Sequence, residues 1–316
     1  MNSDQVQAVV LELPLVAKWP DLTGILKQAM SHPRQDWELP LLALRAVGGD
    51  ENLIPPASAA LICIQLSITL VDDILDDDPR GAHLKYGNGA TANIAQALQA
   101  IAFHLIAALP VAAERRSAVI DSLAQMAFGT AFGQSLDVQN LQGEENYWKV
   151  VRAKSTPFYG AGLQIGALLG QASPELAAGI YEFGALNGEI IQIYDDLTDA
   201  LRSPANPDWK RTNNNLAILY ALTAQHPERA DFLGLLPQVD RPESLRQAQA
   251  ILVHSGALSY CVYHVIRRYQ AARRILDSLP LVDPAPLQTV LARQIKPVLT
   301  LLNQVGAAIP PELSDV

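Results

Sequence analysis

The sequence predicts an all-α protein built as a single domain over residues 1–316. Alternation of apolar and polar residues with a period of two, which marks a half-buried strand, occurs nowhere in the chain. Apolar residues recur instead at helical spacing, and Pro and Gly separate the helical runs. No linker with a shift in composition divides the chain. The expected fold is therefore one bundle of helices.

The composition fits a large buried core and argues against several partners. Hydrophobic residues make up 49% of the 316 residues, charged residues make up 17%, and the formal net charge is -9. This negative balance argues against nucleic acid as a partner. The two cysteines, Cys63 and Cys261, suggest neither a disulfide framework nor a zinc site. The first ten residues lack the basic start of a signal peptide, so a cytoplasmic protein is expected.

Three stretches without a formal charge are about as long as a membrane span. They are Asn52–Val71, Thr91–Ala113 and Ser155–Pro174. Polar residues interrupt the first two, and the third is rich in glycine. Buried helices of a globular domain explain these stretches better than transmembrane helices do, so no transmembrane span is expected.

The helices are expected in the following order. Short helices with breaks at Pro14 and Pro20 fill residues 4–30, and another helix covers Trp37–Val47. Pro55 and Pro56 open a long helix, because proline fits the first turn of a helix. A loop of glycines and basic residues follows over residues 80–89, and a second loop covers 203–208. Further helices are expected over residues 90–109, 114–139, 144–170, 174–202, 213–225, 242–277 and 285–305.

Two copies of one acidic pattern, a pair of aspartates with a third aspartate three residues later, follow largely uncharged helical runs. The six residues are Asp72, Asp73, Asp76, Asp195, Asp196 and Asp199. Residues three and four apart share a face of a helix, so each copy groups its carboxylates. Such carboxylates repel one another, and Mg²⁺ bridging to a phosphate would offset the repulsion. One copy would suit a solvated helix end equally well, whereas two copies favour a metal site.

Other motifs appear in order with the aspartates, and the set resembles the trans-isoprenyl diphosphate synthases of the polyprenyl synthetase family, from about Gly48 to Gln270. Gly133–Asp137 is similar to the GQxxD segment of that family, and Lys154–Thr156 to its Lys-Thr segment. Ile191–Asp199 is similar to its FQxxDDxxD motif. The resemblance implies a helical bundle of the isoprenoid synthase type with a deep central cavity, and aspartate clusters that face each other across its mouth.

The resemblance also implies roles for individual residues. The six aspartates would bind Mg²⁺, about three ions together with the diphosphate of an allylic prenyl substrate. Lys154 would contact the leaving diphosphate and act in catalysis. Ser155 or Thr156, together with Gln192, would place oxygen dipoles near the allylic carbocation. Taken without its flanking match, Lys154 would be an ordinary solvated lysine.

The implied function is that of a transferase in isoprenoid biosynthesis. It would condense an allylic prenyl diphosphate with isopentenyl diphosphate to give a polyprenyl diphosphate of C20 or more. Ser67, five residues before Asp72, is small where family members with short products carry an aromatic residue, which suggests room for a long chain. The resemblance further implies a homodimer formed through uncharged helices.

The acceptor side departs from the family pattern. The Gly-Gly-Lys segment of the family aligns with Gly48–Asn52, which carries two acids, and Gln65 stands in place of a histidine. Arg80 remains from an Arg-Arg-Gly segment, and Lys210 lies close to Thr212–Asn215, which replaces Gly-Lys-x-Thr. Arg80 and Lys210 would be further substrate-binding residues. Acids in place of cations predict weak or absent elongation with isopentenyl diphosphate.

Three hypotheses stay open at this point. The chain is a prenyl diphosphate synthase with an unusual acceptor site, or a relative that ionises the allylic diphosphate and passes the cation elsewhere. Water, the double bonds of the substrate itself, as in a terpene cyclase, or an acceptor without a diphosphate would then receive the cation. The third hypothesis is a non-catalytic subunit that binds prenyl diphosphate. It ranks last because all six aspartates are present.

Overall fold

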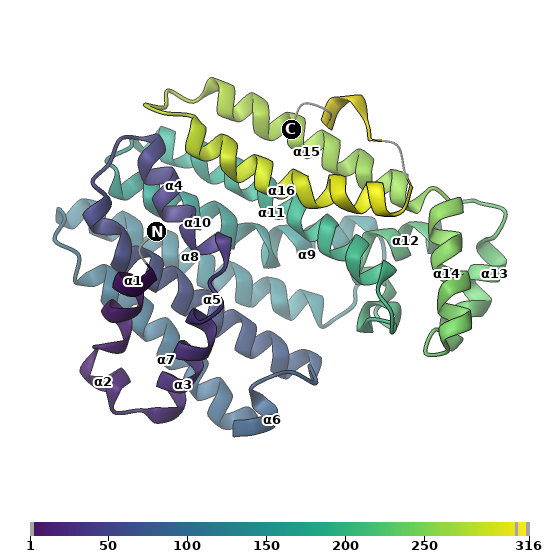
Figure 1. Cartoon of the computed structure of the whole chain (residues 1–316), viewed down its shortest axis with the longest axis horizontal. Helices are drawn as coiled ribbons and strands as arrows, with labels where there is room; N and C mark the ends of the chain where they lie inside the picture. The colour runs from purple at the N-terminus through teal and green to yellow at the C-terminus, as the bar shows by residue number, and fades with distance from the viewer. Residues whose placement is uncertain (1–2, 307–308, 314–316) are drawn as a thin grey trace. The chain divides into compact units, whose positions relative to one another are not determined.

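The computed structural model describes residues 3–306 and 309–313, and these residues form helices and no strand (Figure 1). The predicted all-α class is confirmed. The chain divides into two compact units, each assembled from three stretches. The first unit combines the chain up to Ala131 with Pro157–Ala185 and Ile275–Val290. The second combines Phe132–Thr156, Leu186–Arg274 and the chain from Leu291 onward. One domain over residues 1–316 stays a prediction.

The N-terminal part of the first unit is a series of helices in which prolines open several elements. Pro14 and Pro20 begin their helices, in agreement with the breaks expected at these positions. The elements are α1 (Ser3–Leu11), α2 (Pro14–Ala17), α3 (Pro20–Met30), the 3-10 helix η1 (Gln35–Glu38), α4 (Leu39–Ala46), η2 (Glu51–Leu53), α5 (Ile54–Asp76), α6 (His83–Tyr86) and α7 (Asn88–Ala107).

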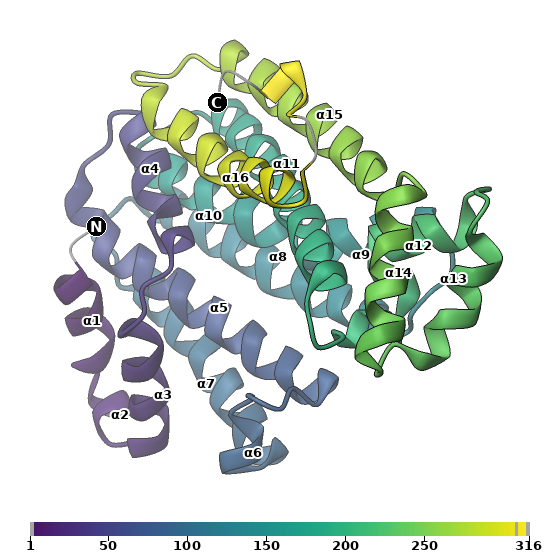
Figure 2. The same ribbon diagram turned by 45° about the vertical axis from the view of Figure 1, so that its right-hand side comes forward.

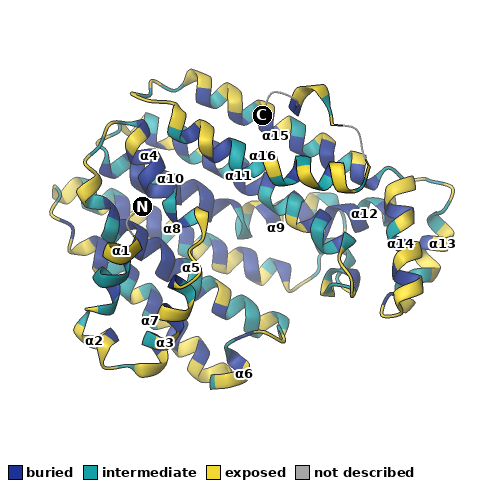
Figure 3. Cartoon of the chain, viewed as in Figure 1, coloured by how far each residue is buried: buried dark blue, intermediate teal, exposed yellow. Residues whose placement is uncertain are grey.

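Helix α5 is the central element of this part. It packs along α7, and the two helices lie side by side in both views (Figures 1 and 2). Residues Ala57–Ile64 are buried without a gap (Figure 3). α5 and α7 are long and apolar enough to span a membrane by length and composition, but 61% of the most apolar window around α5 is buried within the fold. A core helix accounts for α5 without a membrane.

Five helices contribute residues to both units. They are α8 (Ala113–Asp137), α10 (Thr156–Leu169), α11 (Pro174–Leu201), α15 (Ala257–Ser278) and α16 (Ala285–Gln304). The remaining elements belong to the second unit. They are α9 (Glu144–Lys154), η3 (Pro207–Trp209), η4 (Thr212–Asn214), α12 (Leu216–Thr223), α13 (Arg229–Leu235), η5 (Leu236–Gln238), α14 (Pro242–His254) and η6 (Pro311–Leu313).

The structure corrects two of the expected helices and adds helix α13. The helix expected over 144–170 is two helices that meet at Ser155, because Pro157 has no N–H for an unbroken helical ladder. The helix expected over 242–277 is also two helices, α14 and α15, because Gly256 between them adopts a left-handed backbone (φ 87°). Helix α13 was not expected at all, since its seven residues are too few for a clear periodic signal.

Glycines let α10 approach α4 closely. A Cβ atom at Gly166 would lie 2.0 Å from the carbonyl oxygen of Pro40, and one at Gly170 would lie 2.3 Å from Val47 Cγ2. The obstacle at Gly166 is backbone, which cannot rotate away as a side chain can. The glycine-rich run after Ser155 is therefore explained by helix packing inside the first unit.

We predict that Gly166→Ala destabilises the protein. Alanine favours a helix over glycine by about 1 kcal/mol, but overpacking against backbone costs about 1–3 kcal/mol or more, so the clash prevails. Gly89→Ala, in the first turn of α7, is the matched control, because no heavy atom lies within 4 Å of its added Cβ. Urea unfolding would measure both variants. A Gly166→Ala protein as stable as the parent would disprove the close approach.

Candidate active site

The first aspartate set lies at the C-terminal end of α5, in the first unit. Asp72, Asp73 and Asp76 are partly exposed, and Asp77, the next residue, has a left-handed backbone (φ 52°). Partial burial raises the pKa of Asp73, and the carboxylates of Asp78 and Asp72 raise it further. The charged form of Asp73 is therefore disfavoured until a cation offsets its surroundings.

The loop after α5 folds back onto the helix through His83. The imidazole of His83 is buried, and its Nε2 lies 3.6 Å from the carboxylate of Asp77. A Cβ atom at Gly81 would lie 2.4 Å from His83 Nδ1 and 3.0 Å from Asp73 Cβ, so a larger residue there would displace the His83 imidazole. His83 falls within the loop expected over residues 80–89, where no role is predicted for it. The only signal for its burial is Gly81, two positions earlier.

Arg80, a predicted substrate-binding residue, is held by the same loop. Its Nε and Nη2 donate to the carboxylate of Asp78 at 3.1 and 2.8 Å, and its backbone N–H donates to the same carboxylate at 2.7 Å. These hydrogen bonds lower the pKa of Asp78. The Arg80 side chain is 77% exposed. Exposed ion pairs contribute little stability, so a phosphate could replace Asp78 at small cost.

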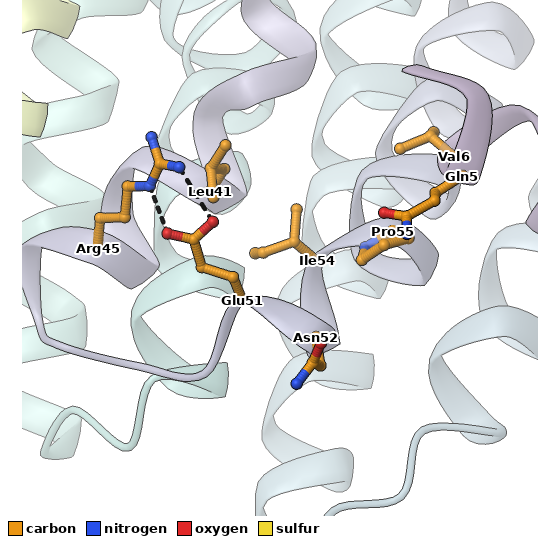
Figure 4. Close-up of a pocket in the computed structure, with 8 residues that line it drawn as sticks. All are labelled: Gln5, Val6, Leu41, Arg45, Glu51, Asn52, Ile54 and Pro55. Carbon is orange, nitrogen blue, oxygen red and sulfur yellow. Dashed lines mark hydrogen bonds and ion pairs between the residues drawn. The ribbon is translucent and has the colours of Figure 1, made fainter. Parts of the chain in front are cut away.

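The acidic segment Gly48–Asn52 lies at the opposite end of α5 from the aspartates. Glu51 accepts hydrogen bonds from Arg45 at 2.7 and 3.0 Å, beside a cavity of about 320 Å³ (Figure 4). A helix rises about 1.5 Å per residue, which puts Asn52 roughly 30 Å from Asp72. An acceptor bound at this segment could not reach a donor at Asp72. The alignment of Gly48–Asn52 with the acceptor segment of the family is therefore wrong.

A different turn, η1, packs near the first aspartate set. Trp37 Nε1 donates to Gln65 Oε1 at 2.5 Å. Gln65 precedes Asp72 by seven residues, so the two share a face of α5 at a separation of about 10 Å. Arg34, immediately before η1, has a 57% exposed side chain 3.4 Å from the carboxylate of Asp36. The contact through Trp37 thus packs η1 against the face of α5 that carries Gln65 and Asp72.

The second aspartate set occupies α11, in the second unit, and its members differ in exposure. Asp195 is exposed and Asp199 is partly exposed, whereas Asp196 is only 1% exposed. Burial raises the pKa of Asp196 well above its ordinary value, and hydrogen-bond donors oppose that rise. Its carboxylate accepts from the Tyr147 hydroxyl at 2.6 Å, the Leu216 N–H at 2.8 Å and Gln192 Nε2 at 2.9 Å. Asp196 is therefore anchored by the protein itself.

Lys154, at the end of α9, is fixed by the end of α8. Its Nζ lies 2.6 Å from the carboxylate of Asp137, and the two side chains are 23% and 11% exposed. A Cβ atom at Gly133 would lie 2.2 Å from the Lys154 backbone nitrogen, so glycine permits this approach. The GQSLD segment thus meets Lys154 through its first and last residues. A solvated lysine, the ordinary alternative, does not describe Lys154.

Ser155 and Thr156 make different contacts. The Ser155 hydroxyl donates to Gln192 Oε1 at 2.6 Å, and the Thr156 hydroxyl donates to the Arg152 carbonyl at 2.6 Å within the turn. Gln192 in turn donates to Asp196. The structure therefore brings Ser155, Gln192 and Asp196 into one hydrogen-bonded chain next to Lys154. The Thr156 hydroxyl is engaged with backbone, and its predicted catalytic role stays a prediction.

The segment after the second aspartate set is held by asparagines. Lys210, predicted to bind substrate, is 69% exposed, with its Nζ 3.3 Å from Asp240. The side chains of two asparagines anchor the segment instead: Asn214 donates to the Asp137 carbonyl at 2.9 Å, and Asn215 donates to the Asp196 carbonyl at 2.7 Å. The residues that replace Gly-Lys-x-Thr thus support both Asp137 and Asp196.

The carboxylates suit a magnesium ion by their chemistry. Among residues 3–306 and 309–313, no three His, Cys, Asp or Glu side chains are already gathered closely enough to hold a metal. Mg²⁺ nevertheless prefers carboxylate oxygens, usually takes only one or two from the protein, and keeps several waters. The raised pKa of Asp73 also reflects like charges that a divalent cation would relieve. The six aspartates remain the predicted ligands.

Comparison with known proteins identifies the family. The family model described as polyprenyl synthetase matches residues 39–252. The chain is 32% identical over 168 residues to the geranylgeranyl diphosphate synthase of Methanosarcina mazei, covering 50% of this chain and 52% of that one. It is 25% identical over 269 residues to the short chain isoprenyl diphosphate synthase of Methanothermobacter thermautotrophicus, covering 80% and 82%. The chain thus matches about half the length of the first relative and most of the second.

Solved structures show the same fold. The geranylgeranyl pyrophosphate synthetase from Pyrococcus horikoshii superposes with a TM-score of 0.79 at 18% identity, over 93% of this chain and 94% of that one. The enzyme from Corynebacterium glutamicum, complexed with calcium and isoprenyl diphosphate, gives 0.77 at 21% identity, over 94% and 93%. The chain belongs to the polyprenyl synthetase family and has its all-α fold. The predicted resemblance to the prenyl diphosphate synthases is confirmed by this membership.

We predict that the two adjacent aspartates of α11 respond differently to substitution. Asp196→Ala leaves buried donors without a partner and should lower the free energy of unfolding by about 2–4 kcal/mol. Asp195→Ala, the matched control on the exposed side, should change it by less than about 0.5 kcal/mol. Urea unfolding at neutral pH would compare them. Equal stability of the two variants would contradict the anchoring of Asp196.

Proposed function

We propose that the chain is a Mg²⁺-dependent prenyl diphosphate synthase, which ionises an allylic prenyl diphosphate and condenses it with isopentenyl diphosphate. The observation that carries the proposal is the hydrogen-bonded chain of Ser155, Gln192 and Asp196 next to the Lys154–Asp137 pair. It combines an ammonium, oxygen dipoles and carboxylates in one unit. A leaving diphosphate and an allylic cation require these groups.

In the proposed reaction, Lys154 donates hydrogen bonds to the diphosphate as its C–O bond breaks and negative charge accumulates. Ser155 and Gln192 direct oxygen dipoles toward the allylic cation, and their mutual hydrogen bond keeps them oriented. The six predicted aspartate ligands would hold Mg²⁺, which would supply Lewis acidity that stabilises the leaving group. The released diphosphate accepts the final proton, so no side chain needs to act as base or nucleophile.

We assign the diphosphate of the acceptor to Arg34 and Arg80, with Gln65 between η1 and the aspartates. Two observations support this choice over Gly48–Asn52. The hydrogen bond from Trp37 places η1 against Gln65, and Arg80 follows α5 directly. Both arginines are more than half exposed and so can turn toward a ligand. We retain Lys210 as a further substrate-binding residue.

A second candidate function is the transfer of the allylic cation to an acceptor without a diphosphate, including cyclisation within the substrate. One observation favours it: carboxylates already occupy the guanidinium groups proposed for the acceptor. Arg80 is bound by Asp78, and Arg34 lies 3.4 Å from Asp36. An enzyme that keeps these pairs closed would ionise its donor and pass the cation to an uncharged acceptor.

We propose a product of C20 or more. Ser67 is fully buried on α5, and its hydroxyl accepts a hydrogen bond from Gln99 Nε2 at 3.0 Å. A serine at this position occupies far less volume than an aromatic ring would. A growing prenyl chain would then pass α5 and reach a greater length before side chains block it.

The proposed function is tested by incubating the protein with Mg²⁺ and geranyl, farnesyl or geranylgeranyl diphosphate, each with and without isopentenyl diphosphate. Mass spectrometry should find longer diphosphates only when both substrates are present. Hydrocarbons or alcohols formed without isopentenyl diphosphate would establish the second candidate. If no donor is consumed in any mixture, the proposal fails and a binding subunit is the remaining explanation.

Binding can be measured apart from turnover. A ligand that binds only the folded state raises its melting temperature. We expect geranylgeranyl diphosphate to raise the melting temperature only when Mg²⁺ is present, because the aspartates alone would repel it. An equal rise with a chelator present would disprove the role of the metal.

We also propose that the protein is a cytoplasmic homodimer. Phe128 is 77% exposed on α8, and the exposed positions of α7, such as Ala92, Gln96 and Ala100, carry no charge. Exposed apolar surface of this kind marks contacts between proteins.

Light scattering should therefore give about twice the chain mass of 34.2 kDa. Phe128→Glu should shift the mass toward the monomer, because dimerisation would bury the new charge. Leu15→Glu, which replaces an 81% exposed residue of α2, should not change the mass. A monomeric parent protein at micromolar concentration would refute the proposal.

A further inference from the structure

Helix α9 carries two sets of contacts on two faces. Tyr147 and Lys154 are seven residues apart and share one face, from which they reach Asp196 and Asp137. Glu144, Trp148 and Arg152 are spaced four apart and form a second face. The rotation of α9 about its axis therefore decides where the groups of the first face point.

The second face is bound to α15 by aromatic and charged groups. Glu144 accepts hydrogen bonds from Trp148 Nε1 at 2.9 Å and from the Tyr260 hydroxyl at 2.7 Å. The centroid of the Trp148 ring lies 5.0 Å from that of the His264 ring. The Arg268 guanidinium lies over the Trp148 ring, 3.9 Å from the ring centroid. These contacts have strict geometric requirements, because a ring and a guanidinium attract only when stacked.

A buried ion pair connects the same face to α11. Arg268 Nε lies 2.5 Å from Glu189, and the two side chains are only 10% and 11% exposed. Arg152 Nε lies 3.2 Å from the other carboxylate oxygen of Glu189 and is 64% exposed. Arg268 also shares a hydrogen bond of 3.0 Å with His264 Nδ1. Glu189 is thus bridged between one buried and one exposed arginine.

Glu189 lies on the helix that carries the site. It precedes Gln192 by three residues and Asp196 by seven, so all three share a face of α11. The ion pair is therefore linked to both helices whose residues form the hydrogen-bonded chain. A buried ion pair is seldom more stabilising than apolar residues of the same size, and its best-supported contribution is to fix one arrangement among several.

We propose that Arg268 and Glu189 are positioning residues, which fix the rotation of α9 against α11 and thereby orient Lys154, on the first face of α9, toward the allylic diphosphate. The inference rests on the proposed function. Neither residue needs to touch substrate. Their effect is transmitted through Arg152 and Trp148 on the second face of α9 to the groups on its first face.

The test separates positioning from stability by means of a charge-neutral double variant. Arg268→Met alone leaves the buried carboxylate of Glu189 without its buried ion-pair partner. This variant should therefore have a lower melting temperature and a lower turnover than the parent. The double variant Arg268→Met/Glu189→Leu removes both charges and should melt close to the parent. Its kcat should nonetheless stay about tenfold or more below the parent, because small displacements at a reacting centre have effects of that size or larger. Arg267→Met, an exposed neighbour on α15, is the control and should match the parent in both measurements.

Two further measurements complete the experiment. Arg268→Lys keeps the charge but loses the planar group that stacks on Trp148, and it should fold with a lowered kcat and an unchanged KM for the acceptor. The Mg²⁺-dependent rise in melting temperature with geranylgeranyl diphosphate should shrink in the double variant.

A double variant with the melting temperature and kcat of the parent would overturn the inference. If the double variant fails to fold, parental kcat in Arg268→Lys would overturn it equally. If the parent neither binds nor consumes any prenyl diphosphate, the proposed function fails first, and the inference falls with it.

Discussion

The burial of one carboxylate, that of Asp196, is the constraint on which the second unit depends. A buried charge costs several kcal/mol unless hydrogen-bond donors surround it. Asp196 obtains its donors from three elements: Tyr147 of α9, Gln192 of α11 and the N–H of Leu216 at the start of α12. Because each donor must be in place at once, this single group fixes the mutual positions of the three helices.

The three members of each aspartate set differ in their positions around the helix. On a helix, the first and third members of the pattern lie about 40° apart, and the middle member lies about 100° from the first and about 60° from the third. In both sets burial raises the pKa of that middle residue, Asp73 on α5 and Asp196 on α11. Asp196 is buried and its carboxylate is held by hydrogen bonds, whereas Asp72, Asp73 and Asp76 are all partly exposed. The same short pattern therefore gives a buried anchor in α11 and three partly exposed carboxylates in α5.

Local patterns in the sequence were enough to predict the fold class, individual helices and the family. Proline at helix starts and apolar periodicity gave the all-α class and the course of α5, and the ordered motifs gave the family. The interruption at Ser155 depended on Pro157, and its consequence could not be foreseen: it frees the Ser155 hydroxyl for Gln192. Gly48 and Gly49 resembled a known segment, but the length of α5 rules out that role. Such distances, like the burial of His83 against the end of α5, depend on packing between elements that no short motif contains.

The proposed binding of a diphosphate would add negative charge to a chain whose net charge is already -9. The ion pairs in the structure show that its cations are already partly neutralised. The cations assigned to substrate already have carboxylate neighbours: Lys154 with Asp137, Arg80 with Asp78 and Arg34 with Asp36. A diphosphate that takes over one of these cations leaves the displaced carboxylate close by, so the exchange alone makes the surroundings more negative. A divalent cation bound with the diphosphate would offset this charge, since it would bring positive charge to the predicted aspartate ligands and to the substrate at once. The pairing of the cations thus supports the proposed need for Mg²⁺, which would make the site selective for diphosphates that arrive with the metal.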